Sequence, residues 1–110
     1  MNKSLGITIF FIGIIMTSWS SSTLAADIEA GEQIFNANCA ACHAGGKNAI
    51  IANKTLEQDV LEKYDMYDID AITTQVTNGK GAMPAFGGRL EPEDIENVGN
   101  YVLSQAEKGW

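Results

Sequence analysis

The chain has 110 residues, the length of one small domain, and it carries 14 acidic against 7 basic side chains for a net charge of −7 at pH 7. This surplus of negative charge argues against binding to nucleic acid or to anionic membranes, and it favours a partner with a basic docking surface. The chain contains only two cysteines and one histidine.

The first 25 residues are typical of a secretory signal peptide. Lys3 is the only charged side chain before Asp27, and the mostly apolar run of 12 residues from Leu5 to Met16 is followed by small residues. This run is shorter than the ~20 residues of a spanning helix, so an uncleaved membrane anchor is less favoured. We expect cleavage after Ala25 or one residue later, in a bacterium or a plastid. The remaining domain, residues 26–110, then has a net charge of −8, because Lys3 is lost.

The first helix of this domain is predicted from about Asp27 to Ala41. Asp27 can cap its N-terminus, and acidic side chains in the first turns favour the helix dipole. Small, apolar and amide side chains then recur on one face: Ile28, Gly31, Ile34, Phe35 and Asn38.

The end of this helix carries Cys39-Ala40-Ala41-Cys42-His43, the haem attachment pattern of c-type cytochromes. Two thiols about one helical turn apart can each add to one vinyl group on the same edge of the porphyrin. The adjacent His43 can then direct its imidazole at the iron. We therefore predict Cys39 and Cys42 as covalent anchors of one haem c, and His43 as an axial iron ligand.

Three other interpretations of the two cysteines are weaker. A thioredoxin-type dithiol follows a strand in a βαβ unit, and no strand is predicted before Cys39. A zinc site normally needs four ligands, and this chain offers only two cysteines and one histidine, with no second cluster. A disulfide between Cys39 and Cys42 remains possible in an oxidising compartment.

Three further helices are predicted, which makes the domain all-α. One follows a capping box formed by Thr55 and Gln58, with an apolar stripe of Leu56, Val60, Leu61 and Tyr64. Another begins near Asp68 and ends at Asn78-Gly79, burying Ile69, Ile72 and Val76. The last begins at Pro92 and buries Ile95, Val98, Gly99, Tyr101 and Val102. Gly31 and Gly99, in the first and last helices, are predicted to allow a close crossing with Phe35 and Tyr101 packed around it.

Met83 is the candidate for the second axial ligand. It lies in the glycine-rich segment that follows Asn78, and Pro84 restricts it to an extended backbone. Met66 lies in an acidic turn between helices and keeps the usual role of a methionine, that of filling core space. Ligation by histidine and methionine leaves the iron no open position, which indicates an electron carrier rather than an enzyme.

With these motifs in place, the domain resembles the cytochrome c6 family of cyanobacteria and algae over essentially its whole length. The resemblance rests on Gly31–Phe35, Asn38–Gly46, Lys54–Leu56, Gln75–Phe86, Gly87–Leu90, Tyr101–Leu103 and Lys108–Trp110. It implies a class I cytochrome c fold of about four helices around one covalently bound haem, with His43 and Met83 as axial ligands. It also implies that Gln75 lies near the haem and helps to keep the potential high, and that Arg89 lies at the docking face.

The resemblance further implies a soluble, monomeric one-electron carrier of photosynthesis in the thylakoid lumen. Its partners would be cytochrome f of the b6f complex as donor and photosystem I as acceptor. The alternative in the same chemistry is a bacterial periplasmic cytochrome c that donates electrons to a terminal oxidase. A small haem peroxidase is less favoured, because the chain has no second histidine for acid–base work. A haem-free disulfide module is the remaining interpretation.

Overall fold

A computed structural model describes Gly13 and residues 24–110, and it describes side chains from Ile28 onward in the first helix. The elements in chain order are α1 (Leu24–Asn38), α2 (Ala40–His43), a 3-10 turn η1 (Ala44–Gly46), α3 (Gln58–Lys63), α4 (Ile69–Asn78) and α5 (Pro92–Lys108). The predicted signal peptide, residues 1–25, lies outside the described residues apart from Gly13 and the start of α1. α1 begins at Leu24, three residues before the predicted start, so Asp27 lies inside the helix and not at its N-cap.

Within residues 24–110 the fold is helical, as predicted, and its one extended pairing is the bridge between Lys80 and Met83. None of the helices in this range combines the length and hydrophobicity that a bilayer crossing requires. The helix predicted to reach Ala41 is divided at Cys39, where α1 stops and the single turn of α2 begins.

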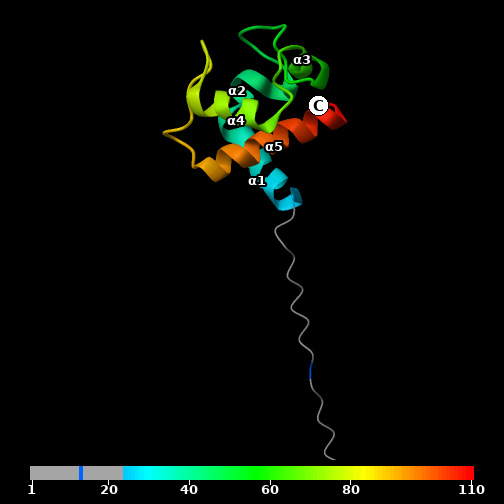
Figure 1. Cartoon of the computed structure of the whole chain (residues 1–110), viewed down its shortest axis with the longest axis vertical. Coiled ribbons are helices and arrows are strands. Elements are labelled where there is room, and N and C mark those ends of the chain that lie inside the picture. Colours follow the sequence, from blue (N-terminus) through cyan, green and yellow to red (C-terminus); the bar gives the residue numbers. More distant parts are fainter. Residues whose placement is uncertain (1–12, 14–23) are drawn as a thin grey trace, which may run out of the picture.

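The crossing of α1 over α5 organises the molecule (Figure 1). Gly31 makes the crossing close, because a Cβ atom on it would overlap the backbone carbonyl of Asn97. The rings of Phe35 and Tyr101 pack beside this contact with their centroids 5.3 Å apart. The predicted close approach of the first and last helices at Gly31 is therefore confirmed.

Gly99 serves a different crossing from the one predicted. A Cβ atom on Gly99 would lie 2.8 Å from Ile69 Cδ1 and 3.3 Å from Thr73 Cγ2, both on α4. Gly31 thus allows α1 to approach α5, and Gly99 allows α4 to approach α5 on another side.

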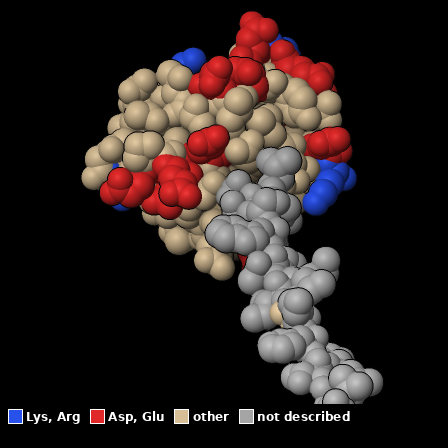
Figure 2. Space-filling model, turned by 60° about the horizontal axis from the view of Figure 1, so that its bottom comes forward, with Lys and Arg blue, Asp and Glu red and all other residues tan. Residues whose placement is uncertain are grey.

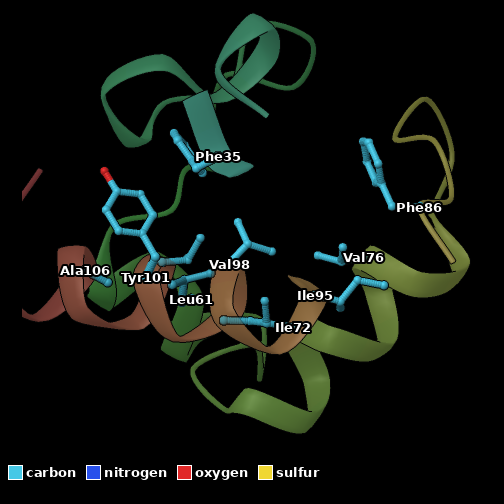
Figure 3. Close-up of a cluster of buried hydrophobic side chains, with 10 residues drawn as sticks. Phe35, Leu61, Ile72, Val76, Phe86, Ile95, Val98, Tyr101 and Ala106 are labelled. Atoms are coloured by element: carbon cyan, nitrogen blue, oxygen red, sulfur yellow. The ribbon is translucent and has the colours of Figure 1, made fainter. Parts of the chain in front are cut away.

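One hydrophobic core fills the space between these helices (Figure 3). Val98 is the most completely buried of its members, with 1% of its surface exposed. The full set is Phe35, Leu61, Ile72, Val76, Phe86, Ile95, Val98, Tyr101, Val102 and Ala106. The stripes predicted for the helices that became α4 and α5 supply six of these ten residues: Ile72, Val76, Ile95, Val98, Tyr101 and Val102.

The helix predicted to begin after Thr55 begins later than expected. The predicted capping box does not form, and the side chain of Gln58 donates to Glu62 within α3 instead. The reason lies at Leu56, whose N–H donates to Gly46 O at 2.7 Å and whose carbonyl accepts the indole N–H of Trp110 at 2.8 Å. This residue is held by distant segments, so the helix starts only beyond it.

Tyr64 was predicted in the apolar stripe of this helix, and that prediction is wrong. It is 38% exposed and follows the last residue of α3. The ammonium groups of Lys54 and Lys63 lie 5.4 and 5.6 Å from its ring centroid. The helix ends before Tyr64 can turn toward the core, and cations stack on the exposed ring instead.

Candidate haem site

The turn at Cys39 gathers the two cysteines and the histidine. The backbone N–H groups of Cys42 and His43 both donate to Cys39 O, at 3.2 and 2.9 Å, so the three residues share one helical turn. Cys39 is half-buried and Cys42 is exposed, and neither forms a disulfide. Burial, aided by the charge of nearby Cys42, raises the pKa of the Cys39 thiol to about 11. Cys39 is therefore a neutral thiol at pH 7, unlike the activated thiolate of a dithiol oxidoreductase.

The imidazole of His43 is oriented by the loop that follows it. Its Nδ1 lies 2.9 Å from the carbonyl oxygen of Lys47. A carbonyl can only accept a hydrogen bond, so Nδ1 must carry a proton, and in the neutral ring the lone pair is then on Nε2. A neutral imidazole whose other nitrogen donates to a backbone carbonyl is the usual form of a metal-binding histidine.

Met83 lies in a tight turn at the end of α4. Lys80 and Met83 exchange two backbone hydrogen bonds of 3.0 Å each. Gly79, with φ of 73°, turns the chain sharply away from the end of α4, in a conformation that residues with a Cβ atom rarely adopt. Beyond the turn, Phe86 N–H donates to Val76 O at 2.9 Å. Residues 79–86 are thus anchored at both ends to the last turns of α4.

The side chain of Gln75 reaches this turn from α4. Its Nε2 lies 3.6 Å from Met83 Sδ, in the range of a weak N–H···S hydrogen bond. The thioether has a second lone pair for a metal. The structure therefore brings together two residues that lie eight positions apart in the sequence. The residue pattern itself gave no reason to pair them, and only the family resemblance placed both near the haem.

Met66 and Met83 are similarly half-buried against the core, so burial does not distinguish them. Met66 follows α3, and its backbone N–H donates to Leu61 O at 2.7 Å. The side-chain contact from Gln75 and the anchored turn distinguish Met83.

Arg89 is exposed in the segment between Met83 and α5. Its guanidinium lies 5.6 Å from the ring centroid of Phe86, and its backbone N–H donates to Phe86 O at 2.9 Å. Phe86 is a core residue, so Arg89 extends to the surface from a fixed base. The structure gives no contact between Arg89 and the cysteines or His43.

Two surface hollows of the described residues are separate from these side chains. One, of about 720 Å³, lies where the end of α5 meets α3 and is lined partly by Glu57, Glu62 and Trp110. The other, of about 470 Å³, lies between α4 and the start of α5. Neither is lined by Cys39, Cys42, His43 or Met83.

The donor set fits haem iron. It offers one imidazole nitrogen, one thioether sulfur and two unpaired thiols on a single turn. Sequence reasoning did not identify the carbonyl of Lys47 as the partner of His43, since a backbone acceptor leaves no mark on the sequence. It also gave no role to the C-terminal Trp110, although a tryptophan at a chain end was a visible signal.

Known proteins resemble the chain along its whole length. Residues 26–102 match the family model described as cytochrome C oxidase, cbb3-type, subunit III. Cytochrome c6 of Porphyra purpurea is 58% identical over 110 residues and covers all of both chains. Cytochrome c6 of a Nostoc species is 54% identical over 110 residues, covering 100% of this chain and 99% of that one.

The crystal structure of cytochrome c6 from the diatom Phaeodactylum tricornutum superposes with a TM-score of 0.75 at 60% identity, covering 76% of this chain and 99% of that one. The two cytochromes c6 of Porphyra and Nostoc match this chain over its full length, whereas the family model matches residues 26–102, so these relatives decide the family. The chain therefore belongs to the cytochrome c6 family, the fold is that of a class I c-type cytochrome, and the protein is an electron carrier with one covalently bound haem c.

Proposed function

We propose that this protein carries single electrons from cytochrome f of the b6f complex to photosystem I. In this proposal residues 1–25 are removed, and residues 26–110 act as a soluble monomer in the thylakoid lumen. Cys39 and Cys42 hold the haem through thioether bonds, and His43 and Met83 are its axial ligands. Arg89 contributes to the docking face.

The haem would supply an iron that alternates between the ferric and ferrous states. The residues of the chain would set its environment. The Nε2 lone pair of His43 would bind the iron while the Lys47 carbonyl accepts the Nδ1 proton. The side-chain amide of Gln75 donates a hydrogen bond to the sulfur of Met83. A hydrogen bond to this sulfur withdraws electron density from a soft ligand, which favours the ferrous state and raises the potential.

The contact between Gln75 and Met83 is the observation that carries the electron-carrier mechanism. It supports Met83 as the sixth ligand, and a closed coordination shell favours electron transfer over binding of a substrate at the iron. The partners themselves rest on the family resemblance and on the acidity of the chain.

Flash-induced reduction of photosystem I by the purified, processed protein tests the proposed partner. We expect fast, saturable reduction after each flash. Covalent attachment is tested separately, because haem should stay with the chain in denaturing electrophoresis and be released when Cys39 and Cys42 are both serine. Loss of haem from the unmodified protein would contradict the thioether assignment.

A second candidate is a periplasmic cytochrome c that feeds a terminal oxidase. The match of residues 26–102 to the cbb3-type cytochrome C oxidase subunit III model favours it. Oxidation of the reduced protein by photosystem I and by a cbb3-type oxidase can be compared at equal ionic strength. A faster rate with the oxidase would replace the photosynthetic assignment.

A further inference from the structure

Trp110 is held in place although α5 ends two residues earlier at Lys108. Here the indole N–H donates to Leu56 O at 2.8 Å, over a separation of 54 residues. The indole ring packs 5.3 Å from the ring of Phe35 and 6.0 Å from that of Tyr101, centroid to centroid.

The indole also closes over Gly46. A Cβ atom on Gly46 would overlap ring carbons of Trp110, so the backbone at residue 46 lies directly against the indole. Gly46 O accepts the N–H of Leu56 at 2.7 Å. Trp110 therefore contacts both residues whose hydrogen bond closes the loop from Gly46 to Leu56.

The carbonyl that orients His43 belongs to this loop. Lys47 directly follows Gly46, and its oxygen lies 2.9 Å from His43 Nδ1. Two contacts and one peptide bond connect Trp110 to the histidine. The indole packs against Gly46, the peptide bond joins Gly46 to Lys47, and the Lys47 carbonyl lies on His43 Nδ1.

We propose that Trp110 is a positioning residue for the proximal ligand. It acts by fixing the loop closed by Gly46 and Leu56, so that the Lys47 carbonyl stays in place to accept the Nδ1 proton of His43. This inference rests on the proposed ligation by His43. Its physical basis is that a carbonyl on a loop accepts reliably only if the loop is fixed, and the indole supplies one hydrogen bond and a flat packing surface for it.

The two contributions of Trp110 can be separated by substitution. Trp110→Phe keeps an aromatic ring and removes the hydrogen bond to Leu56, whereas Trp110→Ala removes both. Ile69→Ala is the matched control. Ile69 of α4 lies against Gly99 of α5, so this truncation should lower stability without touching Trp110 or the Gly46–Leu56 loop.

Proton NMR of the reduced, haem-loaded protein gives the readout. In Trp110→Phe, the Leu56 N–H and the His43 Nδ1–H should exchange with solvent about fivefold faster than in the unmodified protein. This factor corresponds to the loss of one hydrogen bond. The His43 Nδ1 proton should also move upfield as its hydrogen bond weakens. Trp110→Ala should enlarge both effects, and the N–H of Val98, at the α1–α5 crossing, should report any change in global unfolding.

Unchanged exchange and shift at His43 in both Trp110 variants would overturn the proposal, as would equal changes in Ile69→Ala. The ligation itself is read from the unmodified protein, whose His43 ring protons should be displaced far upfield by the haem. If they are not, the proposed ligand is wrong, yet the loop can still be tested, because the Leu56 and His43 protons belong to the chain.

Discussion

Two hydrogen bonds to single atoms set the chemistry of the proposed ligands. The Lys47 carbonyl fixes which nitrogen of His43 carries the proton, and the Gln75 amide uses one lone pair of the Met83 sulfur. The first contact leaves Nε2 of His43 available to bind iron, and the second leaves the other lone pair of the Met83 sulfur available. Substitutions of Gln75 and Met83 should therefore change the spectrum or the reduction potential before they change the fold.

Met83→Ala should abolish the weak far-red sulfur-to-iron band of the oxidised protein, and Met66→Ala should retain it. The potential of Met83→Ala should fall, because water or nitrogen in place of a soft thioether favours the ferric state. Absorption spectroscopy and redox titration measure both effects. Retention of the band in Met83→Ala would transfer the ligand role to Met66.

Gln75→Val should lower the reduction potential while leaving the far-red band in place. The variant removes one N–H···S hydrogen bond, so the thioether donates more strongly and the ferric state gains about 1 kcal/mol, or roughly 40 mV. Gln58→Val is the control, since Gln58 bonds to Glu62 on α3. An equal shift in both variants would assign the effect to general polarity.

The helix crossings depend on close backbone approach. α1 comes so near to α5 that Gly31 has no room for a Cβ atom beside the Asn97 carbonyl, and α4 closes on Gly99 from another side. These crossings carry the Cys39 turn on one helix and the Met83 turn on another. Their spacing thus positions both halves of the candidate site.

Gly31→Ala should destabilise the haem-loaded protein by about 1–3 kcal/mol, because the obstacle is backbone and can move only with the helix. Gly88→Ala is a matched control, since a Cβ atom there would meet nothing within 4 Å. Guanidinium unfolding measures both. Similar midpoints for Gly31→Ala and the unmodified protein would show that the crossing tolerates a wider spacing.

For the whole molecule, the uneven charge is the dominant long-range feature. Figure 2 shows groups of acidic side chains spread over one face, with lysine or arginine side chains toward its edge. The processed chain would carry a net charge of −8. Such a field steers encounters over distances at which no single side chain makes contact.

The rate of electron transfer to photosystem I should fall as salt is added, because charges are screened over ~8 Å at physiological ionic strength. Arg89→Glu should slow transfer even at high salt, where only local contacts remain. Flash kinetics across a salt series measure both, with Lys108→Glu at the end of α5 as a control of equal charge change. A rate that rises with salt would refute electrostatic steering toward a basic dock.

The sequence by itself determined what is local. The spacing of Cys39, Cys42 and His43 predicts a haem attachment site, and the 3.6-residue periodicity indicates α4 and α5. The start predicted near Asp68 is confirmed, and the Asp68 side chain accepts the Ala71 N–H there at 3.0 Å. The predicted start of the last helix at Pro92 is also confirmed, because proline suits the first position of a helix. These features depend on neighbours within about one or two helical turns.

Tertiary structure decided which distant groups meet. An apolar stripe shows that a helix face is buried but not which helix covers it, so Gly31 and Gly99 could not be assigned to separate crossings beforehand. The start of α3 was mispredicted because Trp110, far along the chain, holds Leu56. The Lys47 carbonyl could not be identified at all, since every residue has one and only the folded loop brings that oxygen to His43.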